Sequence, residues 1–377
     1  MPSRVCVVGY GRVGSLTAEF VSKHYDITVY DTSDRAVERA RRRGFEAHLS
    51  DTTSNTVVSK IASHCDVVAT ALPSNRALDV IKLLIDSGVN AIVDVSYIPD
   101  PTVLRRPAID RRVKVFVDVG IAPGLSNILL AYGYRLMERT ESAIIYVGGI
   151  AEEDDGVLGL VASWNMEDLL EEYVRPARAR IAGRLRELNP INDAIRVRLE
   201  GLGEFDALPT DGLRTLLESF SNIPTMIEYT LRYPGHLERL RLLDKLGLLE
   251  GGYRSVHGQA VQPRSLLARL LEEKLPREKD RVILYVEVKG LSSKGRMVST
   301  FLLDERQSKL KTKTPVLSYV TALIHSWFVL RAVEGYGHIG LNTPEETGLN
   351  ADETKKLFEY LASHGIRVKT RQCIEEY

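Results

Sequence analysis

The sequence contains few cysteines and no cysteine pattern typical of a metal site. Cys6, Cys65 and Cys373 are the only three among 377 residues, and they lie far apart. No CxxC motif and no Cys/His spacing typical of a zinc site is present. We therefore expect no bound metal. We also expect all three cysteines to be reduced thiols of a cytoplasmic protein.

An excess of charge of one sign and long hydrophobic runs are also absent. The chain has 50 Lys+Arg and 50 Asp+Glu residues, which argues against electrostatic binding to nucleic acid or to an anionic membrane. No apolar run reaches the roughly 18 residues of a membrane-spanning helix. The first residues, Arg4–Gly9, have the pattern of a strand and not of a signal peptide. We expect a globular protein of two domains, or of three small ones, with no nucleic-acid or membrane partner.

Short apolar strands alternate with helices over the first 125 residues. Expected strands are Arg4–Gly9, Asp26–Tyr30, Cys65–Thr70, Ala91–Val95 and Val113–Val119, with helices at 13–24, 36–43 and 78–85. This alternation predicts parallel βαβ units, and the nearly continuous apolar character of the strands predicts a sheet covered on both faces. The fold class is therefore α/β, with an N-terminal Rossmann domain that has a doubly wound parallel sheet (1–125).

The pattern changes after residue 125. Expected strands are Ser142–Gly149, Arg196–Arg198, Val282–Lys289 and Arg296–Leu303, and expected helices are Arg214–Phe220, His236–Leu246, Ser265–Leu275, Leu317–Val333 and Thr354–His364. This mixture predicts a second, mixed α/β domain over 126–325. We expect a C-terminal helical segment, 326–377, to pack back on the Rossmann domain. His325 and Trp327 lie in an apolar helical stretch, which favours the core over a site.

A glycine-rich turn follows the first expected strand. Gly9-Tyr-Gly11-Arg-Val-Gly14 has the spacing GxGxxG, and Asp31 follows Gly9 by 22 residues (31 − 9) at the end of the second strand. This context is the dinucleotide-binding fingerprint. Gly11 would let the backbone approach a pyrophosphate, and Asp31 would bind the ribose hydroxyls and repel a 2′-phosphate. We therefore expect NAD as the cofactor, although Arg35 could hold the extra phosphate of NADP.

Ligands of such sheets bind at the carboxyl ends of the strands. The expected cofactor contacts are Gly9, Gly11, Arg12, Val13, Gly14, Asp31, Arg35, Asp51, Ala71, Leu72, Pro73, Val95, Ser96, Ala122 and Pro123. The alternative is a glycine turn that binds no ligand.

Several later segments resemble the saccharopine dehydrogenase-like family, and most closely its lysine 6-dehydrogenase branch. They are Asp94–Tyr97, Gly120–Asn127, Ser163–Ala177, Thr210–Thr215, Thr230–His236 and Thr343–Leu349. The resemblance implies an NAD(P)-linked dehydrogenase that acts on an amine carbon of a lysine-like amino acid. It also implies that the second domain carries the substrate pocket and a subunit interface, so we expect a homodimer or a higher homo-oligomer.

Two departures from the family pattern bear on the reaction. Ala122 stands where saccharopine reductases usually have an acidic residue, and Val147 stands where they often have a cysteine. Both favour oxidation of the ε-amine of lysine by NAD, followed by hydrolysis to the 6-semialdehyde with release of ammonia. The alternatives are a saccharopine or carboxynorspermidine type of dehydrogenase/reductase, and a non-enzymatic NAD-sensing regulatory protein.

The chemistry needs a proton acceptor and groups that hold an amino acid. Hydride leaves only from a neutral amine, so a side chain must accept or relay a proton. The catalytic candidates are Asp94, Tyr97 and His236. Arginine binds a carboxylate bidentately and aspartate binds an ammonium. The substrate candidates are Asp211, Arg214, Arg232 and Trp164. For each of these residues a purely structural role, such as helix capping or packing, is the alternative.

Overall fold

The structure is a computed structural model that describes residues 3–155, 158–310 and 312–374. It divides into two compact units. Unit 1 comprises residues 1–132 and 318–364, and unit 2 comprises 133–317 and 365–377. The boundaries expected at 125 and 325 differ from these because helix α6 (Leu125–Arg135) and helix α11 (Val316–Val333) run through the actual ones. A continuous helical pattern gives no loop signal at which a boundary can be placed.

Unit 1 contains a seven-stranded parallel sheet with the order β17-β6-β5-β4-β1-β2-β3. The strands are β1 (Arg4–Val8), β2 (Asp26–Asp31), β3 (Glu46–Leu49), β4 (Val67–Thr70), β5 (Ala91–Asp94), β6 (Lys114–Phe116) and β17 (Gly340–Asn342). The order reverses on either side of β1, as in a doubly wound sheet. The expected Rossmann fold class is confirmed.

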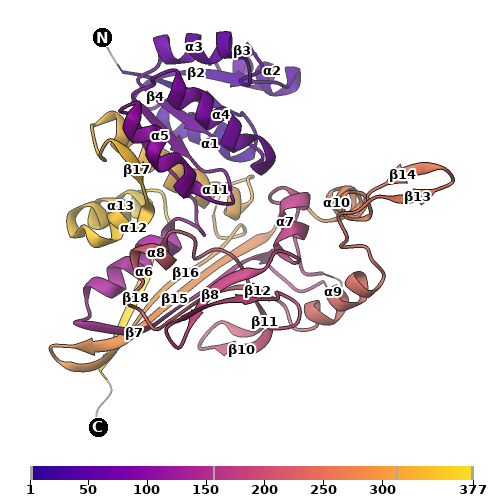
Figure 1. The fold of residues 1–377 in the computed structure, drawn as a ribbon, viewed down its shortest axis with the longest axis vertical. Helices are drawn as coiled ribbons and strands as arrows, with labels where there is room; N and C mark the ends of the chain where they lie inside the picture. Colours follow the sequence, from indigo (N-terminus) through magenta and orange to yellow (C-terminus); the bar gives the residue numbers. More distant parts are fainter. Residues whose placement is uncertain (1–2, 156–157, 311, 375–377) are drawn as a thin grey trace. The chain divides into compact units, whose positions relative to one another are not determined.

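Helices from both ends of the chain complete unit 1 (Figure 1). They are α1 (Arg12–Val21), α2 (Asp34–Arg42), α3 (Asn55–His64), α4 (Ser74–Asp86), η1 (Pro101–Leu104), α5 (Arg105–Asp110), α12 (Pro344–Leu349) and α13 (Ala351–Ser363), together with most of α6 and α11. The segment expected at 326–377 is divided, because β18 (Lys369–Ile374) pairs with a strand of unit 2.

Helix α11 is the one described helix that is long and apolar enough to span a membrane, and 72% of it is buried within the protein. Its His325 contacts Thr17 Oγ1 through Nδ1 at 3.0 Å and the Val93 carbonyl through Nε2 at 2.9 Å. Burial lowers the pKa of His325 to about 4, so the ring is neutral. The helix is therefore a core element of unit 1.

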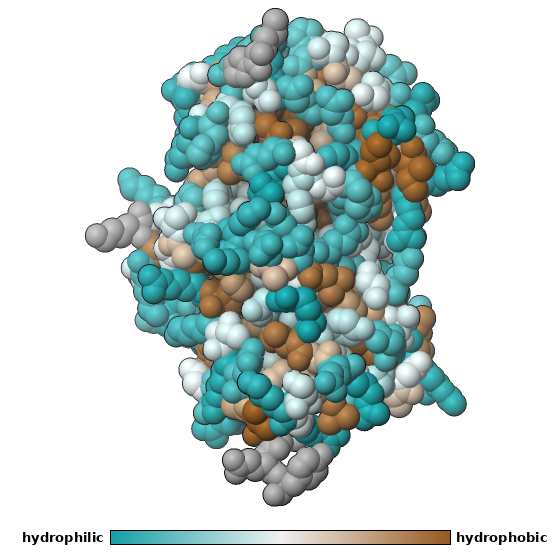
Figure 2. All heavy atoms as spheres, turned by 90° about the vertical axis from the view of Figure 1, so that its left-hand side faces the viewer, coloured by the Kyte–Doolittle hydropathy of each residue, from teal (hydrophilic) through white to brown (hydrophobic). Residues whose placement is uncertain are grey.

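On the face drawn in Figure 2, hydrophobic residues form small separate groups among hydrophilic ones.

Cys6 and Cys65 form a disulfide. Cys6 lies in β1 and Cys65 directly precedes β4, the strand that pairs with β1, so the two Cα atoms lie 5.8 Å apart. The expectation of reduced thiols is therefore wrong for this pair, and only Cys373 is free. Their separation by 59 residues in the sequence concealed the pairing, which depends on strand order.

Unit 2 contains a nine-stranded mixed sheet. Its main path is β10-β11-β12-β7-β15-β16-β18, with β8 paired to β12 and β9 paired to β8. The strands are β7 (Arg139–Ala151), β8 (Ala177–Ile181), β9 (Arg184–Leu188), β10 (Ile195–Leu199), β11 (Gly203–Pro209), β12 (Thr225–Arg232), β15 (Asp280–Ser292), β16 (Gly295–Arg306) and β18. Only the β7–β12 pairing is parallel among the described strands of this sheet.

Within the described part of unit 2, four further helices and one hairpin accompany this sheet. They are α7 (Met166–Glu172), α8 (Leu216–Ser219), α9 (His236–Lys245), α10 (Pro263–Lys274) and the β13–β14 hairpin (Arg254–Val256 and Gln259–Val261) (Figure 1). Helices α7 and α10 pack on each other, and they share an apolar cluster with Leu237 and Leu240 of α9.

The two faces of β12 differ in chemistry. Ile227, Tyr229 and Leu231 belong to a hydrophobic cluster on one face. The alternate residues, which point to the opposite face of a strand, are polar: Glu228, Thr230 and Arg232. All three polar side chains are buried. Because buried charge is costly unless it is partnered, this face is the place in unit 2 to look for a site.

Candidate functional site

The glycine turn combines two packed glycines with one open position. A Cβ atom on Gly9 would lie 2.3 Å from the Ala71 carbonyl oxygen, and one on Gly14 would lie 1.9 Å from the Gly9 carbonyl oxygen. Beside Gly11, the residue that caps α1, a Cβ atom would meet no described atom within 4 Å. Open space therefore adjoins the N-terminus of α1, where backbone N–H groups bind phosphate. These residues fit a dinucleotide.

Asp31 lies over the same turn. Its Oδ2 accepts a hydrogen bond from the Tyr10 backbone N–H at 2.6 Å, and its Oδ1 accepts one from the Ser33 backbone N–H at 2.8 Å. Arg35 is exposed at the start of α2. The other nearby cation, Arg39, donates to the Tyr10 carbonyl at 2.7 Å. The backbone thus fixes the Asp31 carboxylate where ribose hydroxyls are expected.

Asp94 is the centre of a buried hydrogen-bond network at the ends of β4 and β5. Its Oδ1 accepts from Thr70 Oγ1 at 2.6 Å and from Ser96 Oγ at 2.7 Å, and Ser96 Oγ accepts from the Leu72 N–H at 2.9 Å. Burial raises the pKa of Asp94 to about 7, and repulsion from Asp118 adds to the shift. Asp94 Oδ2 is buried without a hydrogen-bond partner among the described residues.

The remaining unit 1 candidates follow the other strands. Asp51 forms an exposed turn with Thr53, whose hydrogen bonds hold the pKa of the Asp51 carboxyl below its usual range. After β6, Gly124 folds tightly onto Gly120 and fixes the Ala122–Pro123 segment. Positions relative to the strands are as expected for Arg12, Val13, Ala71, Leu72, Pro73 and Val95, and Tyr97 is half-buried after β5. Cofactor contact by these residues stays a prediction.

In unit 2, His236 is enclosed by structural partners. Its Nδ1 lies 2.9 Å from the Leu158 carbonyl, which can only accept, so Nδ1 carries the proton. Its Nε2 therefore accepts from Tyr173 Oη at 3.1 Å. Burial, together with the positive charge of Arg232, lowers the pKa of His236 to about 3, and the ring is neutral. The catalytic role of His236 stays a prediction, but its contacts need no such role.

Two of the predicted substrate residues also have partners. Arg232 donates from Nε to Tyr173 Oη at 2.8 Å and from a terminal nitrogen to the Leu231 carbonyl at 2.9 Å. Its second terminal nitrogen lies 3.5 Å from Glu172. Asp211 accepts a bidentate pair of hydrogen bonds from Arg178, both at 2.8 Å.

Arg214 and Trp164 differ in their surroundings. Arg214 is 5% exposed and has a positive φ of 48°, which is rare for a residue with a side chain. Such strained conformations concentrate at functional sites. Trp164 is 36% exposed and precedes Asn165, the residue that caps α7.

The sequence reading missed Glu228, a carboxylate on the polar face of β12. It is 4% exposed, and burial raises its pKa to about 8, helped by the negative charges of Glu172 and Asp211. A side-chain hydrogen bond with Thr210 and the positive charge of Arg214 both oppose this rise in pKa. Glu228 Oε2 is buried without a hydrogen-bond partner among the described residues. The available signal was a carboxylate among the alternating apolar and polar residues of Ile227–Arg232.

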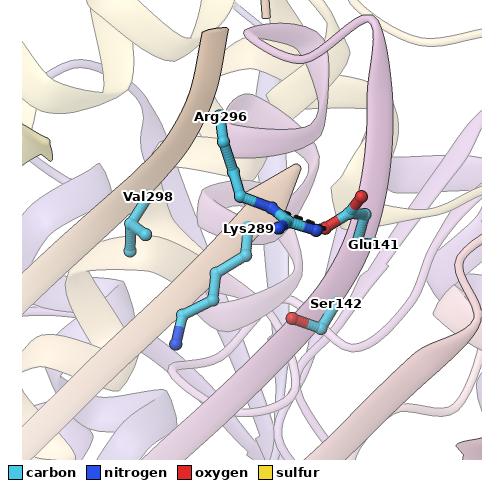
Figure 3. A pocket seen from close by; sticks show the side chains of 5 residues that line it. All are labelled: Glu141, Ser142, Lys289, Arg296 and Val298. Atoms are coloured by element: carbon cyan, nitrogen blue, oxygen red, sulfur yellow. Dashed lines mark hydrogen bonds and ion pairs between the residues drawn. The ribbon is translucent and has the colours of Figure 1, made fainter. Parts of the chain in front are cut away.

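A surface pocket of about 270 Å³ lies elsewhere on the unit 2 sheet (Figure 3). It is lined by Glu141, Ser142, Lys289, Arg296 and Val298. Its cations are paired, because Arg296 binds Glu141 at 2.7 Å and Lys289 binds Glu287 at 2.9 Å. None of the predicted site residues lines it. No group of three or more potential metal ligands occurs within the described ranges.

Comparisons with known proteins identify two family matches. The profile of the saccharopine dehydrogenase C-terminal domain matches residues 120–366, and that of the TrkA-N domain matches residues 5–113. A curated relative, saccharopine dehydrogenase [NADP(+), L-glutamate-forming] of Saccharomyces cerevisiae, is 22% identical over 75% of this chain and 66% of its own length.

Solved structures resemble the whole chain as well. Apo saccharopine dehydrogenase (L-Glu forming) from Saccharomyces cerevisiae has a TM-score of 0.80, with 19% identity, and the match covers 98% of this chain and all of that one. GenD2 from gentamicin A biosynthesis, solved in complex with NAD, has a TM-score of 0.44 at 14% identity, covering all of this chain and 97% of that one. The first likeness shows a shared fold.

Proposed function

Because the chain belongs to the saccharopine dehydrogenase C-terminal domain family, we propose that it is a nicotinamide-dependent dehydrogenase that oxidises an amine carbon of an amino acid. Within that class we propose NAD-dependent oxidative deamination of the ε-amine of L-lysine to the 6-semialdehyde, with release of ammonia. The observation that carries the dinucleotide half is the open backbone at Gly11 beside the fixed Asp31 carboxylate.

The residues of unit 1 would hold the cofactor. The N–H groups at the start of α1 bind its phosphates, and Asp31 binds the adenosine ribose. When bound, nicotinamide supplies the hydride acceptor. We propose that the carboxyl group of Asp94, with a pKa of about 7, exchanges a proton at Oδ2 with the reacting amine, while Thr70 and Ser96 hold Oδ1. A group with a pKa near neutrality is suited to such a transfer.

The residues of unit 2 would hold the amino-acid end of the substrate. The polar face of β12 and the adjoining 210–214 segment carry both acidic and basic side chains in a buried setting. Ala122 and Val147 leave this chain without the acidic residue and the cysteine found in saccharopine reductases, which favours a primary amine as substrate.

A second candidate is the saccharopine type of reaction, in which a secondary amine is cleaved. The whole-chain likeness to the yeast saccharopine dehydrogenase supports it. The same relative uses NADP according to its name, so the preference for NAD is a separate point that needs its own test.

The substrate test is an absorbance screen for reduced nicotinamide with lysine, ornithine, saccharopine and diamines. We expect lysine with NAD to yield NADH, ammonia and a semialdehyde that cyclises, with a rate that rises at alkaline pH as the amine loses its proton. NADH from saccharopine but not from lysine at any pH would replace the proposal by the second candidate. No turnover of any amine would favour a regulatory NAD sensor.

The cofactor test compares kcat/KM for NAD and NADP in the wild type and in Asp31→Ala. The wild type should prefer NAD, because the Asp31 carboxylate repels a 2′-phosphate. The variant should lose most of that preference. If the wild type prefers NADP tenfold or more, we would infer that Arg35 or its neighbours bind the 2′-phosphate.

A further inference from the structure

The polar face of β12 contains a carboxyl group whose environment is incomplete. Glu228 is 4% exposed, and its Oε2 has no hydrogen-bond partner among the described residues. Burying an acceptor without a partner is costly, so such groups are rare without a reason. Glu228 and Thr230 project from the same face of β12, and Thr230 donates to Glu172.

The surrounding backbone is shaped around this carboxyl group. A Cβ atom on Gly212 would lie 1.6 Å from Glu228 Oε1, so the carboxyl group packs directly against the Gly212 backbone and would have to move if this residue had a side chain. Two residues further on, Arg214 adopts its positive φ of 48° with a buried side chain. The Arg214 charge acts on Glu228. Glu228 on β12 and Arg214 on the 210–214 segment thus lie near enough for their charges to interact.

The neighbouring acids are committed to other partners. Asp211 is held bidentately by Arg178, and Glu172 contacts Thr230 and Arg232. Glu228 is therefore the acid of this cluster that retains an unused acceptor atom.

We propose that Glu228 and Arg214 form the recognition site for an α-amino-acid head group, with Glu228 Oε2 accepting from the α-ammonium and Arg214 binding the α-carboxylate. This inference rests on the proposed function, because it supplies the site that anchors the substrate by the end that does not react. In a lysine-like substrate the α-ammonium and α-carboxylate share one carbon, which matches an acid and a guanidinium whose charges interact. Substrates without an α-amino group are expected to bind poorly.

Ligand binding should release a proton. In the free protein the pKa of Glu228 is about 8, so the group is largely protonated at pH 7. The charged groups around it are Glu172 on α7, Asp211 and Arg214 on the adjoining segment, and Arg178 and Arg232 on β8 and β12. An α-ammonium placed at Oε2 favours the ionised carboxylate and lowers its pKa. Complete ionisation at pH 7 would release about 0.9 proton per ligand bound.

The experiment is calorimetric titration of the protein saturated with NADH, in phosphate and in Tris buffer at pH 7. The ligands are L-norleucine, which has the head group but no ε-amine, and 6-aminohexanoate, which has no α-amine. Norleucine should bind and release close to one proton, whereas 6-aminohexanoate should release none. Proton release by 6-aminohexanoate alone, or by neither ligand, would overturn the assignment.

Glu228→Gln tests the residue itself. The amide has the shape of the protonated acid, so the space beside Gly212 is kept and the fold should be retained. We expect norleucine binding to weaken about tenfold or more and proton release to disappear. Glu287→Gln is the matched control, because Glu287 lies on the other face of the sheet, where it contacts Lys289. Unchanged binding and proton release in Glu228→Gln would return Glu228 to a structural role.

The outcome is separable from the test of the proposed function. Norleucine cannot be oxidised at an ε-amine, so its binding reports the head-group site alone. NADH formation from lysine without proton release on norleucine binding would reject this site and leave the reaction intact. Proton release on norleucine binding without NADH formation from lysine would support the head-group site and reject the proposed reaction.

Discussion

At the scale of single residues, two glycines of the same turn should affect different properties: Gly14 the stability of the fold and Gly11 the binding of the ligand. Gly11→Ala adds a Cβ where no described atom lies within 4 Å, whereas Gly14→Ala places one 1.9 Å from the Gly9 carbonyl oxygen. We expect Gly11→Ala to keep its thermal midpoint and to lose NAD affinity, because the methyl group occupies the space needed by the pyrophosphate. Gly14→Ala should lower the thermal midpoint.

Thermal unfolding and NAD titration of both variants provide the measurement. Normal NAD affinity in Gly11→Ala would contradict the assignment of the turn to a dinucleotide, whatever the behaviour of Gly14→Ala.

Asp94 makes the stability of unit 1 depend on pH. Its pKa is about 7 in the folded protein, above the usual aspartate value of 3.8. The folded state therefore binds more protons between these values, and the stability associated with a protonated Asp94 is lost as pH rises from about 4 to 7. Asp94→Asn removes this pH-dependent loss of stability, because an amide does not ionise. The amide oxygen can still accept hydrogen bonds from Thr70 and Ser96. We expect the variant to gain up to about 4 kcal/mol relative to wild type at pH 8, and little at pH 4.

Urea unfolding at pH 4, 6 and 8 measures this difference. A constant difference between the two proteins across that range would show that Asp94 does not titrate there. If Asp94 also exchanges a proton with the substrate, the stabilised variant should turn over more slowly.

At the scale of elements, the predicted strands of unit 1 correspond to β1, β2, β4, β5 and β6, because continuous apolar runs fit a sheet covered on both faces. The prediction for Val113–Val119 was too long. The strand β6 ends at Phe116, and Asp118 adopts a positive φ of 59°. The helix expected to begin at Arg214 begins at Leu216, since Arg214 also has a positive φ. Local periodicity does not report such reversals of the backbone.

Strand β12 was not predicted, and neither was Glu228, although Arg232 on the same strand and Arg214 were named as substrate candidates. Its eight residues include Glu228, Thr230 and Arg232, so they read as amphipathic and exposed, although the structure buries them. The burial depends on partners from distant elements, such as Glu172 and Tyr173. The dinucleotide half of the candidate site was predictable because its residues follow consecutive strands. The polar cluster around Glu228 was not, because tertiary contacts between distant elements assemble it.

The chain of hydrogen bonds from Leu158 through His236 and Tyr173 to Arg232 connects the end of β12 to α7 and α9. His236→Phe would leave the Leu158 carbonyl and the Tyr173 hydroxyl without this partner. We expect a loss of about 1–3 kcal/mol of stability. The pH dependence of kcat/KM should keep its midpoints, because a pKa of about 3 keeps His236 neutral throughout the working range.

Denaturant unfolding and a pH–rate profile of the same variant separate the two roles. A midpoint near neutrality that is present in the wild type and missing in His236→Phe would support the catalytic role predicted from the sequence.

At the scale of the whole molecule, we expect a homodimer formed through one face of the unit 2 sheet. Ile144, Tyr146, Ile227 and Tyr285 are only partly buried on that face, and Tyr146 stacks on Tyr229 at 5.5 Å. Apolar side chains left partly exposed in this way are typical of subunit interfaces. Ile144→Glu should shift the mass measured by light scattering toward that of one chain. The control Leu246→Glu, at a residue that is 64% exposed directly after α9, should not. Equal masses for wild type and Ile144→Glu would argue against this face.

The pairing of β6 with β17 has a consequence for synthesis. Lys114 pairs with Gly340, so the edge of the unit 1 sheet stays open until more than 200 further residues have been made. At about 5–20 residues per second, the ribosome takes roughly 10 to 45 seconds to supply them. During that interval the nascent chain exposes the unpaired N–H and C=O groups of β6, a surface to which other strands can add. The edge strand β17 of the Rossmann sheet is thus synthesised long after the strand it covers, and the exposed edge of β6 must be kept from other chains until then.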